Sequence, residues 1–213
     1  AVASRLQHWV CENAKSTRAY LKRVDVSHPL AHTLQTLNVQ ELPREVHKKG
    51  DHTGNFDARP LLTPALQGHD MGLVSEAGMP AIADPGSSVV RAAHELGVPV
   101  APLVGPVSLL LALAASGLNG QNFAFVGYLP QDAAERAQRI RELEALALRH
   151  GQTQMFIETP YRNAVLLQAL LQTLQPHTRL STSTGLTLDT ARTHSMTVKS
   201  WKQTAGAAPD NST

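Results

Sequence analysis

The sequence predicts an α/β protein with two domains, the first built on a mostly parallel sheet. Strand-like and helix-like segments alternate along most of the chain, which is typical of sheets covered by helices. The clearest unit runs from a strand over 71–74 through a loop rich in Gly and Pro to a helix over 87–96, and a second such unit covers 98–116. Because these loops expose backbone donors at neighbouring strand ends, we expect both to border one binding crevice. Two ordinary strand-to-helix turns are the alternative.

Apolar periodicity assigns the elements of the first domain in chain order. It predicts strands over 6–11, 33–42, 71–74 and 98–103, and helices over 14–24, 61–66, 87–96 and 109–116. Pro64 limits its helix to a short or kinked one, because proline cannot donate a backbone hydrogen bond. The polar, Gly-containing segment 47–55 predicts a mobile loop.

A cluster of turn formers over 116–121 marks the expected domain boundary, so that the domains cover 1–118 and 119–203. The second domain is predicted to contain strands over 123–127, 154–158 and 178–184 and helices over 133–149 and 164–174. A further pair, near Leu186 and over 194–201, suggests an antiparallel edge, which makes the second sheet mixed. The small polar residues 204–213 predict a disordered tail.

Composition narrows the class of protein. The 213 residues include 42% hydrophobic and 17% charged residues, as in ordinary globular proteins, and the longest apolar run, 107–115, is too short to span a bilayer. A single cysteine, Cys11, cannot form an intramolecular disulfide and fits a reducing cytoplasm. A net charge of +2 is low for a dedicated nucleic-acid module. Any RNA contact would therefore need a local patch, for which the candidates are Arg136, Arg139, Arg141 and Arg149.

Five motifs, in consistent order, resemble those of the tetrapyrrole methylase superfamily. Ser-Glu-Ala-Gly-Met-Pro at 75–80 with Ala-Asp-Pro-Gly at 83–86 is similar to its Ser-Asp-Ala-Gly-Thr-Pro…Asp-Pro-Gly signature. The other four are Gly-Pro-Val-Ser at 105–108, Ala-Ser-Gly-Leu at 115–118, Phe-Val-Gly-Tyr-Leu-Pro at 125–130 and Ile-Glu-Thr-Pro-Tyr-Arg at 157–162. The branch with the greatest resemblance methylates a cytidine ribose in small-subunit ribosomal RNA.

The resemblance implies a homodimeric methyltransferase that uses S-adenosyl-L-methionine, with the cofactor cleft between the two α/β domains. It implies that loop 75–82 holds the methionine end of the cofactor and that residues of the second domain approach the adenine. The implied cofactor-binding residues are Ser75, Glu76, Ala77, Gly78, Ile82, Val107, Ser108, Glu158, Ser181 and Thr182. A zwitterionic methionine favours backbone donors at helix starts, and adenine favours backbone groups at strand ends.

Methyl transfer from a sulfonium is an in-line displacement that depends on positioning and is helped by a base that deprotonates the ribose hydroxyl. Glu12 and Glu158, each at a predicted strand end, are the candidate bases, and the alternative for each is a helix cap or an ion-pair partner. Arg162 lies in the first turn of its helix, where a cation opposes the helix dipole. It is therefore a candidate to bind a phosphate or carboxylate, or to form a structural ion pair.

The chain departs from the family pattern at several positions. Asn13 stands where the ribosomal branch has a carboxylate, and Gly-Leu-Thr-Leu at 185–188 lacks the charges of the family's Glu-Leu-Thr-Lys. We also expect the first domain to lack the family's first strand and its Pro/Gly loop. Two other functions therefore stay open. One is methylation of a small molecule such as a tetrapyrrole, and the other is cofactor binding without catalysis.

The ten histidines do not predict a metal site. His28 and His32 have helical spacing, but Pro29 lies between them and no nearby carboxylate completes a known ligand pattern. We therefore expect no metal, no membrane association and a cytoplasmic protein. Possible partners are ribosomal RNA or the small ribosomal subunit and a second copy of the chain.

Overall fold

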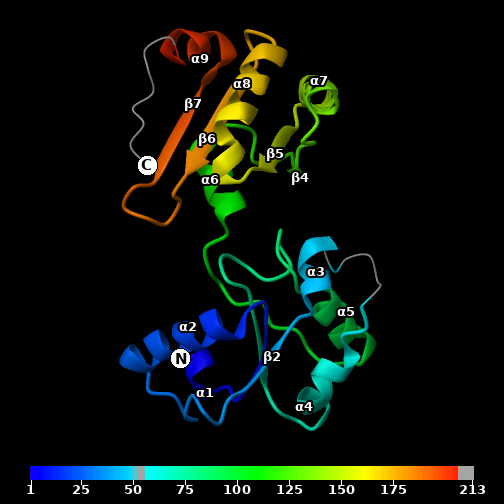
Figure 1. Cartoon of the computed structure of the whole chain (residues 1–213), viewed down its shortest axis with the longest axis vertical. Coiled ribbons are helices and arrows are strands. Elements are labelled where there is room, and N and C mark those ends of the chain that lie inside the picture. The colour runs from blue at the N-terminus through cyan, green and yellow to red at the C-terminus, as the bar shows by residue number, and fades with distance from the viewer. Residues whose placement is uncertain (50, 52–55, 206–213) are drawn as a thin grey trace. The chain divides into compact units, whose positions relative to one another are not determined.

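The computed structural model describes residues 1–49, 51 and 56–205, and their contacts divide the chain into two units, Ala1–Pro106 and Val107–Thr213 (Figure 1). Strands and helices alternate in both units, which confirms the expected α/β class. The division falls between Pro106 and Val107, whereas the turn formers suggested residue 118. Helix α6 (Ser108–Ser116) belongs with the second unit because it packs against the two last strands, β6 and β7.

Unit 1 contains a three-stranded parallel sheet in the order β2-β1-β3. The strands are β1 (His8–Cys11), β2 (Asn38–Glu41) and β3 (Met71–Val74). Cys11 is in register with Glu41 on one side and with Val74 on the other. The carboxyl ends of all three strands therefore meet at one edge of the sheet, where sheets of this kind bind ligands.

Helices and two apolar clusters complete unit 1. The helices are α1 (Val2–Arg5), α2 (Ala14–Ser27), α3 (Arg44–Lys49), the 3₁₀ turn η1 (Arg59–Leu62), α4 (Thr63–Leu66) and α5 (Ser87–Glu95). Val10 of β1 packs with Val89 and Ala92 of α5, while Trp9 packs with Leu21 of α2 on the other face. Burying both faces of the central strand holds β1, and hence its carboxyl end, in place.

Three expectations for unit 1 differ from the structure. The predicted strand over 98–103 does not form, because Pro99 and Pro102 lack the N–H donors that a ladder needs. The predicted strand over 33–42 shortens to β2. In the predicted loop 47–55, residues 47–49 end helix α3 and Asp51 is buried, while residues 50 and 52–55 lie outside the described residues.

Unit 2 contains two separate strand pairs (Figure 1). The strands β4 (Phe123–Tyr128) and β5 (Thr153–Ile157) are parallel, and β6 (Arg179–Thr184) and β7 (Arg192–Thr197) are antiparallel. The remaining elements are α7 (Ala133–His150), the 3₁₀ turn η2 (Pro160–Arg162), α8 (Asn163–Thr173) and α9 (Val198–Ala205). Both parallel and antiparallel pairs are therefore present, as the expectation of a mixed second sheet requires.

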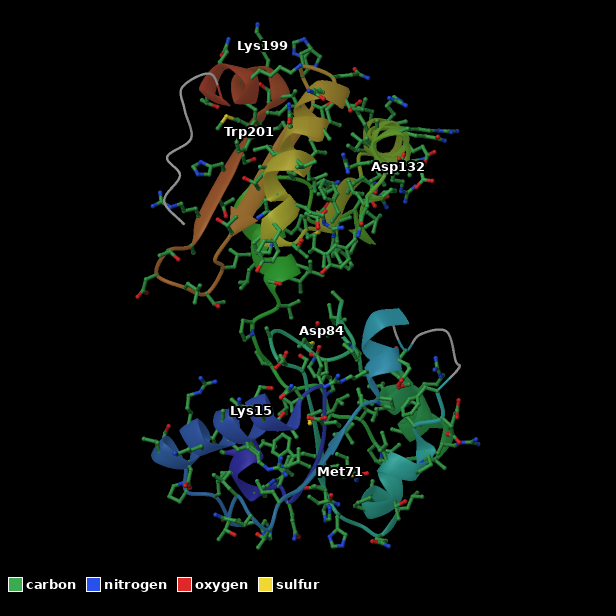
Figure 2. The ribbon with its side chains drawn as sticks, in the orientation of Figure 1. Lys15, Met71, Asp84, Asp132, Lys199 and Trp201 are labelled. Atoms are coloured by element: carbon green, nitrogen blue, oxygen red, sulfur yellow. The ribbon has the colours of Figure 1, made fainter. Side chains whose placement is uncertain are left out.

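The core of unit 2 joins α7, α8 and β6 through Ile140, Leu166 and Leu180. Asp132 caps α7 by accepting hydrogen bonds from the N–H groups of Ala134 and Glu135 (Figure 2). Among the described residues, no helix is both long and apolar enough to cross a membrane.

The carboxyl-terminal elements differ from expectation in two places. Leu186 lies in a turn rather than a strand, and residues 198–201 begin helix α9, so that β7 is the antiparallel edge. Thr204 and Ala205 of the predicted tail end α9, and residues 206–213 lie outside the described residues.

Candidate functional site

The loop between β3 and α5 collects five predicted cofactor-binding residues at the carboxyl edge of the unit 1 sheet. These are Ser75, Glu76, Ala77, Gly78 and Ile82. Two alanines in the same loop, Ala81 and Ala83, have φ angles of 65° and 62°, in the left-handed region that non-glycine residues rarely adopt. The backbone of this loop is therefore held in a strained shape, a feature that often accompanies ligand binding.

Glu12, at the end of β1, contacts this loop directly. Its Oε2 atom accepts a hydrogen bond of 3.2 Å from the N–H of Glu76, and its own N–H donates to the carbonyl of Val74. The structure thus brings two of the predicted site residues, Glu12 and Glu76, together from adjacent strand ends. The other predicted strand end, over 98–103, is not part of this sheet.

Asp84 lies on the same loop (Figure 2), and the charges of Glu12 and Glu76 act on its carboxyl group. Burial raises the pKa of the Asp84 carboxyl, the negative charges of Glu12 and Glu76 raise it further, and a hydrogen bond with Ser75 opposes them. Asp84 therefore binds a proton more readily than an ordinary aspartate. The sequence signal for Asp84 is its place in the Asp-Pro-Gly motif, which predicts a loop but does not by itself indicate a charged site.

The start of α5 is occupied by Asp51, which the sequence analysis did not identify. The Asp51 carboxylate accepts hydrogen bonds of 2.8 Å from the N–H groups of Gly86 and Ser88, 2.6 Å from Ser87 Oγ and 2.7 Å from Ser88 Oγ. Burial alone would raise the pKa of Asp51, but these hydrogen bonds hold it at about 2. The sequence predicts that the donors at this helix start face a ligand, but the N–H groups of Gly86 and Ser88 bind Asp51 instead.

Unit 2 contains a cavity of about 850 Å³ that is lined by four predicted cofactor-binding residues, Ser108, Glu158, Ser181 and Thr182. Ser181 Oγ is buried and has no hydrogen-bond partner among the described residues. Val107, the residue before α6, does not line this cavity. Ser181 thus lines the cavity as a residue, but its Oγ atom has almost no surface accessible from it.

Glu158 and Arg162 form an ion pair at the end of β5. Glu158 Oε1 accepts hydrogen bonds of 2.9 Å from Arg162 Nε and 2.7 Å from the N–H of Thr159, and Arg162 Nη2 lies 2.7 Å from the same oxygen. Burial raises the pKa of Glu158, but the Thr159 and Arg162 hydrogen bonds outweigh it, so the pKa is lowered. This ion pair explains why Arg162, a cation, lies in the first helical turn. The sequence alone allows either a ligand-binding role or an ion pair for this residue.

Two further sequence features have structural partners. Asn13, which stands in place of a family carboxylate, caps α2 by accepting a hydrogen bond of 3.0 Å from the N–H of Ser16. On α7, Arg139 pairs with Glu142 at 3.2 Å, while Arg141 and Arg149 are exposed. In the described part of the chain, no group of three or more His, Cys, Asp or Glu residues is placed to hold a metal ion.

Comparison with known proteins matches the family model described as Tetrapyrrole (Corrin/Porphyrin) Methylases to residues 8–200. Two relatives carry the name Ribosomal RNA small subunit methyltransferase I. The protein from Vibrio cholerae is 37% identical over 124 residues, which are 58% of this chain and 42% of that protein. The protein from Micromonospora olivasterospora is 35% identical over 156 residues, 72% of this chain and 49% of that protein. The chain thus spans about half the length of these curated relatives.

A solved structure, that of the methyltransferase CobJ, covers 92% of this chain and 87% of its own, with a TM-score of 0.50 and 16% sequence identity. At this identity the likeness concerns the fold alone. It agrees with the fold class that the motifs implied.

Proposed function

The chain belongs to the tetrapyrrole methylase family, and from this premise we propose that it is a methyltransferase that uses S-adenosyl-L-methionine to methylate a ribose 2'-hydroxyl of ribosomal RNA. The observation that supports the proposal most is the continuous family match over residues 8–200, which includes both the strained loop and the cavity. The names of the relatives support ribosomal RNA as the acceptor.

The residues present are compatible with the cofactor. The cavity volume of about 850 Å³ is within the range of small-molecule sites, and polar residues such as Ser108 and Thr182 line it. In unit 2 we assign Ser108, Ser181 and Thr182 to the adenosine part. In unit 1 we assign residues 75–78 and Ile82 to the methionine part; of these, residues 76–78 and Ile82 are exposed. The cofactor supplies an electrophilic methyl group on a sulfonium.

Glu12 is better suited than Glu158 to accept a proton. A general base must accept a proton from the reacting hydroxyl, and the hydrogen bonds with Thr159 and Arg162 lower the pKa of Glu158. Glu12 accepts a single, longer hydrogen bond from Glu76. We therefore assign proton transfer to Glu12, and we assign to Glu158 and Arg162 the positioning of the η2 turn beside the cavity.

The assignment is tested with small ribosomal subunits, radiolabelled S-adenosyl-L-methionine and three forms of the chain. A general base contributes about 10²–10⁴-fold, so Glu12→Gln is expected to lower kcat by at least about 100-fold while the cofactor Kd, measured by calorimetry, stays unchanged. Glu95→Gln, an exposed change at the end of α5, serves as the matched control and keeps the wild-type rate.

Three results would contradict the proposal in different ways. Absence of cofactor binding to both the full-length protein and this chain would contradict the methyltransferase proposal. Cofactor binding without transfer to ribosomal subunits, but with transfer to a porphyrinoid, would favour the small-molecule alternative. Binding without any transfer would favour a non-catalytic relative.

We further propose that the protein forms a homodimer and is cytoplasmic; the family resemblance supports both. Contact with ribosomal RNA is assigned to the exposed Arg141 and Arg149 of α7 rather than to Arg139, whose charge is already paired with Glu142. Sedimentation equilibrium of the purified chain measures its oligomeric state directly.

A further inference from the structure

Helix α2 of unit 1 carries a concentration of positive charge. Its 14 residues contain one acidic side chain, Asp25, and four exposed cations, Lys15, Arg18, Lys22 and Arg23. Among the described residues, none of these four cations forms an ion pair. Helix α7, by contrast, balances its four arginines with three glutamates. The low net charge of the chain, +2, is therefore unevenly distributed, and α2 has the larger excess of cations.

Three of these cations lie along one face of the helix. Lys15, Arg18 and Lys22 are spaced by three and then four residues, which brings their side chains to the same face. We call these three residues the α2 stripe. The two residues that α2 buries, Thr17 and Leu21, lie on another side of the helix. Given a rise of about 1.5 Å per residue, the stripe extends over about 10 Å from Lys15, which Figure 2 labels.

The stability of the fold does not explain this arrangement. Like charges three and four residues apart repel one another and destabilise a helix. Lys15 lies in the first turn, where a cation opposes the helix dipole and no acidic residue compensates it. The donors of this helix start are already used. Asn13 accepts a hydrogen bond of 3.0 Å from the N–H of Ser16. Glu41 accepts one of 2.6 Å from the N–H of Ala14. An anion at α2 would therefore be bound by the cationic side chains.

The α2 stripe begins close in the chain to the candidate base. Helix α2 starts at Ala14, two residues after Glu12, and it follows the carboxyl end of β1 directly. Glu12 in turn accepts the hydrogen bond from the N–H of Glu76 in the loop assigned to the methionine part of the cofactor. A polyanion that lies along the stripe therefore reaches the sheet edge where the proton acceptor is assigned.

We propose that the α2 stripe binds the phosphate backbone of single-stranded RNA and so directs the acceptor ribose toward Glu12, an inference that rests on the proposed function and extends it to a second surface besides α7. Lysine and arginine bind phosphates by charge and fix the position of a nucleic acid without reading its bases. At about 3.4 Å per nucleotide, a stripe of about 10 Å spans about three phosphates, one for each cation.

The structure favours RNA over an anionic membrane as the partner of the stripe. A helix that lies on a membrane inserts its apolar side among the lipids. The apolar side of α2 is instead packed inside unit 1, where Leu21 is fully buried against Leu6 and Trp9. A single row of cations also matches one strand of backbone, and an unpaired strand can turn its ribose out toward the sheet edge.

The test is fluorescence anisotropy of a labelled single-stranded RNA of about 12 nucleotides, titrated with the full chain between about 50 and 200 mM NaCl. The stripe variant combines Lys15→Gln, Arg18→Gln and Lys22→Gln. Each phosphate contact to a single strand contributes about 0.7 to the slope of log Kd against log salt, so the slope should fall by about 2. At about 100 mM NaCl the Kd should rise by at least about tenfold, and by a similar factor for RNA of different sequences.

A matched variant separates the position of the charges from the net charge. It combines Arg192→Gln on β7 with Lys199→Gln and Lys202→Gln on α9, which removes three exposed cations elsewhere and should keep the wild-type affinity and slope. Urea denaturation separates binding from a structural role. The stripe variant should be at least as stable as the wild type, because it removes the repulsion between like charges on α2.

Three outcomes would overturn the inference. The first is equal weakening of RNA binding in the two variants, which would reflect net charge alone. The second is an unchanged slope in the stripe variant, which leaves the proposed function intact if the wild type still methylates small ribosomal subunits. The third is that the stripe variant retains RNA binding but no longer binds phosphatidylserine vesicles that the wild type binds. Because RNA affinity is measured without the cofactor, failure of the methyltransferase proposal would not alter this result.

Discussion

Two aspartates at the loop between β3 and α5 have pKa values that are shifted in opposite directions. Asp51, at the start of α5, accepts four hydrogen bonds and has a pKa of about 2. Asp84, inside the loop, has a raised pKa because burial and the carboxylates of Glu12 and Glu76 disfavour its charge. Burial acts in the same direction on both side chains, so the neighbouring donors and charges decide the difference.

The two aspartates therefore affect the stability of the fold in opposite directions. Asp51 uses the donors at the start of α5 and ties that helix to the segment after α3. Asp84 and Glu12 lie where negative charges repel one another, an arrangement that costs stability and is characteristic of functional sites. The helix start therefore stabilises the fold, whereas the carboxylates at the sheet edge are held close together against electrostatic repulsion.

The largest expected effect comes from removing the anchor. Asp51→Ala leaves the buried donors of Gly86 and Ser88 without an acceptor, which should lower the free energy of unfolding by about 3 kcal/mol. Urea denaturation measures it. Asp57→Ala removes an exposed aspartate that pairs with Arg59 and serves as a control with a much smaller expected effect. Equal losses in the two variants would contradict the anchoring role.

Acid should remove the same contribution in the wild-type chain. Because the pKa of Asp51 in the folded state, about 2, lies below its ordinary value of 3.8, its charged form stabilises the fold above pH 3.8. This stability, about 2 kcal/mol, is lost as the pH falls toward 2. Denaturation curves over this range should therefore be steeper in pH for the wild type than for Asp51→Asn. Parallel curves would show that other carboxylates dominate acid unfolding.

Neutralising Asp84 should have the opposite sign and a smaller size. The raised pKa means that the charged form destabilises the fold at neutral pH, so Asp84→Asn should raise the free energy of unfolding. Below the ordinary aspartate pKa this gain should vanish. In the wild-type background, Glu12→Gln should lower the Asp84 pKa followed by NMR, and an unchanged pKa would exclude the proposed coupling.

The smallest effect concerns the strained backbone at Ala83, in the loop that contains Asp84. Ala83→Gly allows the φ angle of 62° without a Cβ clash, but it also increases the entropy of the unfolded chain. A net gain of a few tenths of a kcal/mol in unfolding free energy is expected. Ala92→Gly, in the middle of α5, is the control and should destabilise. Destabilisation of similar size by both would mean that the loop is not strained.

Local patterns were sufficient for most elements and for the identity of the site segments. The strand over 71–74 and the helix over 133–149 follow from short-range periodicity and capping, and the structure has β3 at 71–74 and α7 at 133–150. The loop motif placed residues 75–78 and Ile82 at a strand end. The strand over 98–103 failed because the apolar run outweighed two prolines in the prediction.

The sequence by itself determined the α/β class, the family and the segments that border the sheet edge, because each depends on residues close together in the chain. Only the tertiary structure decided the electrostatic state of those segments. Asp51 lies 35 residues before Gly86, and Glu12 lies 64 residues before Glu76, so no local pattern could reveal either hydrogen bond. Which of the described strands pair in unit 2 likewise depends on which segments meet in space, since pairing is a contact between segments that are distant in sequence.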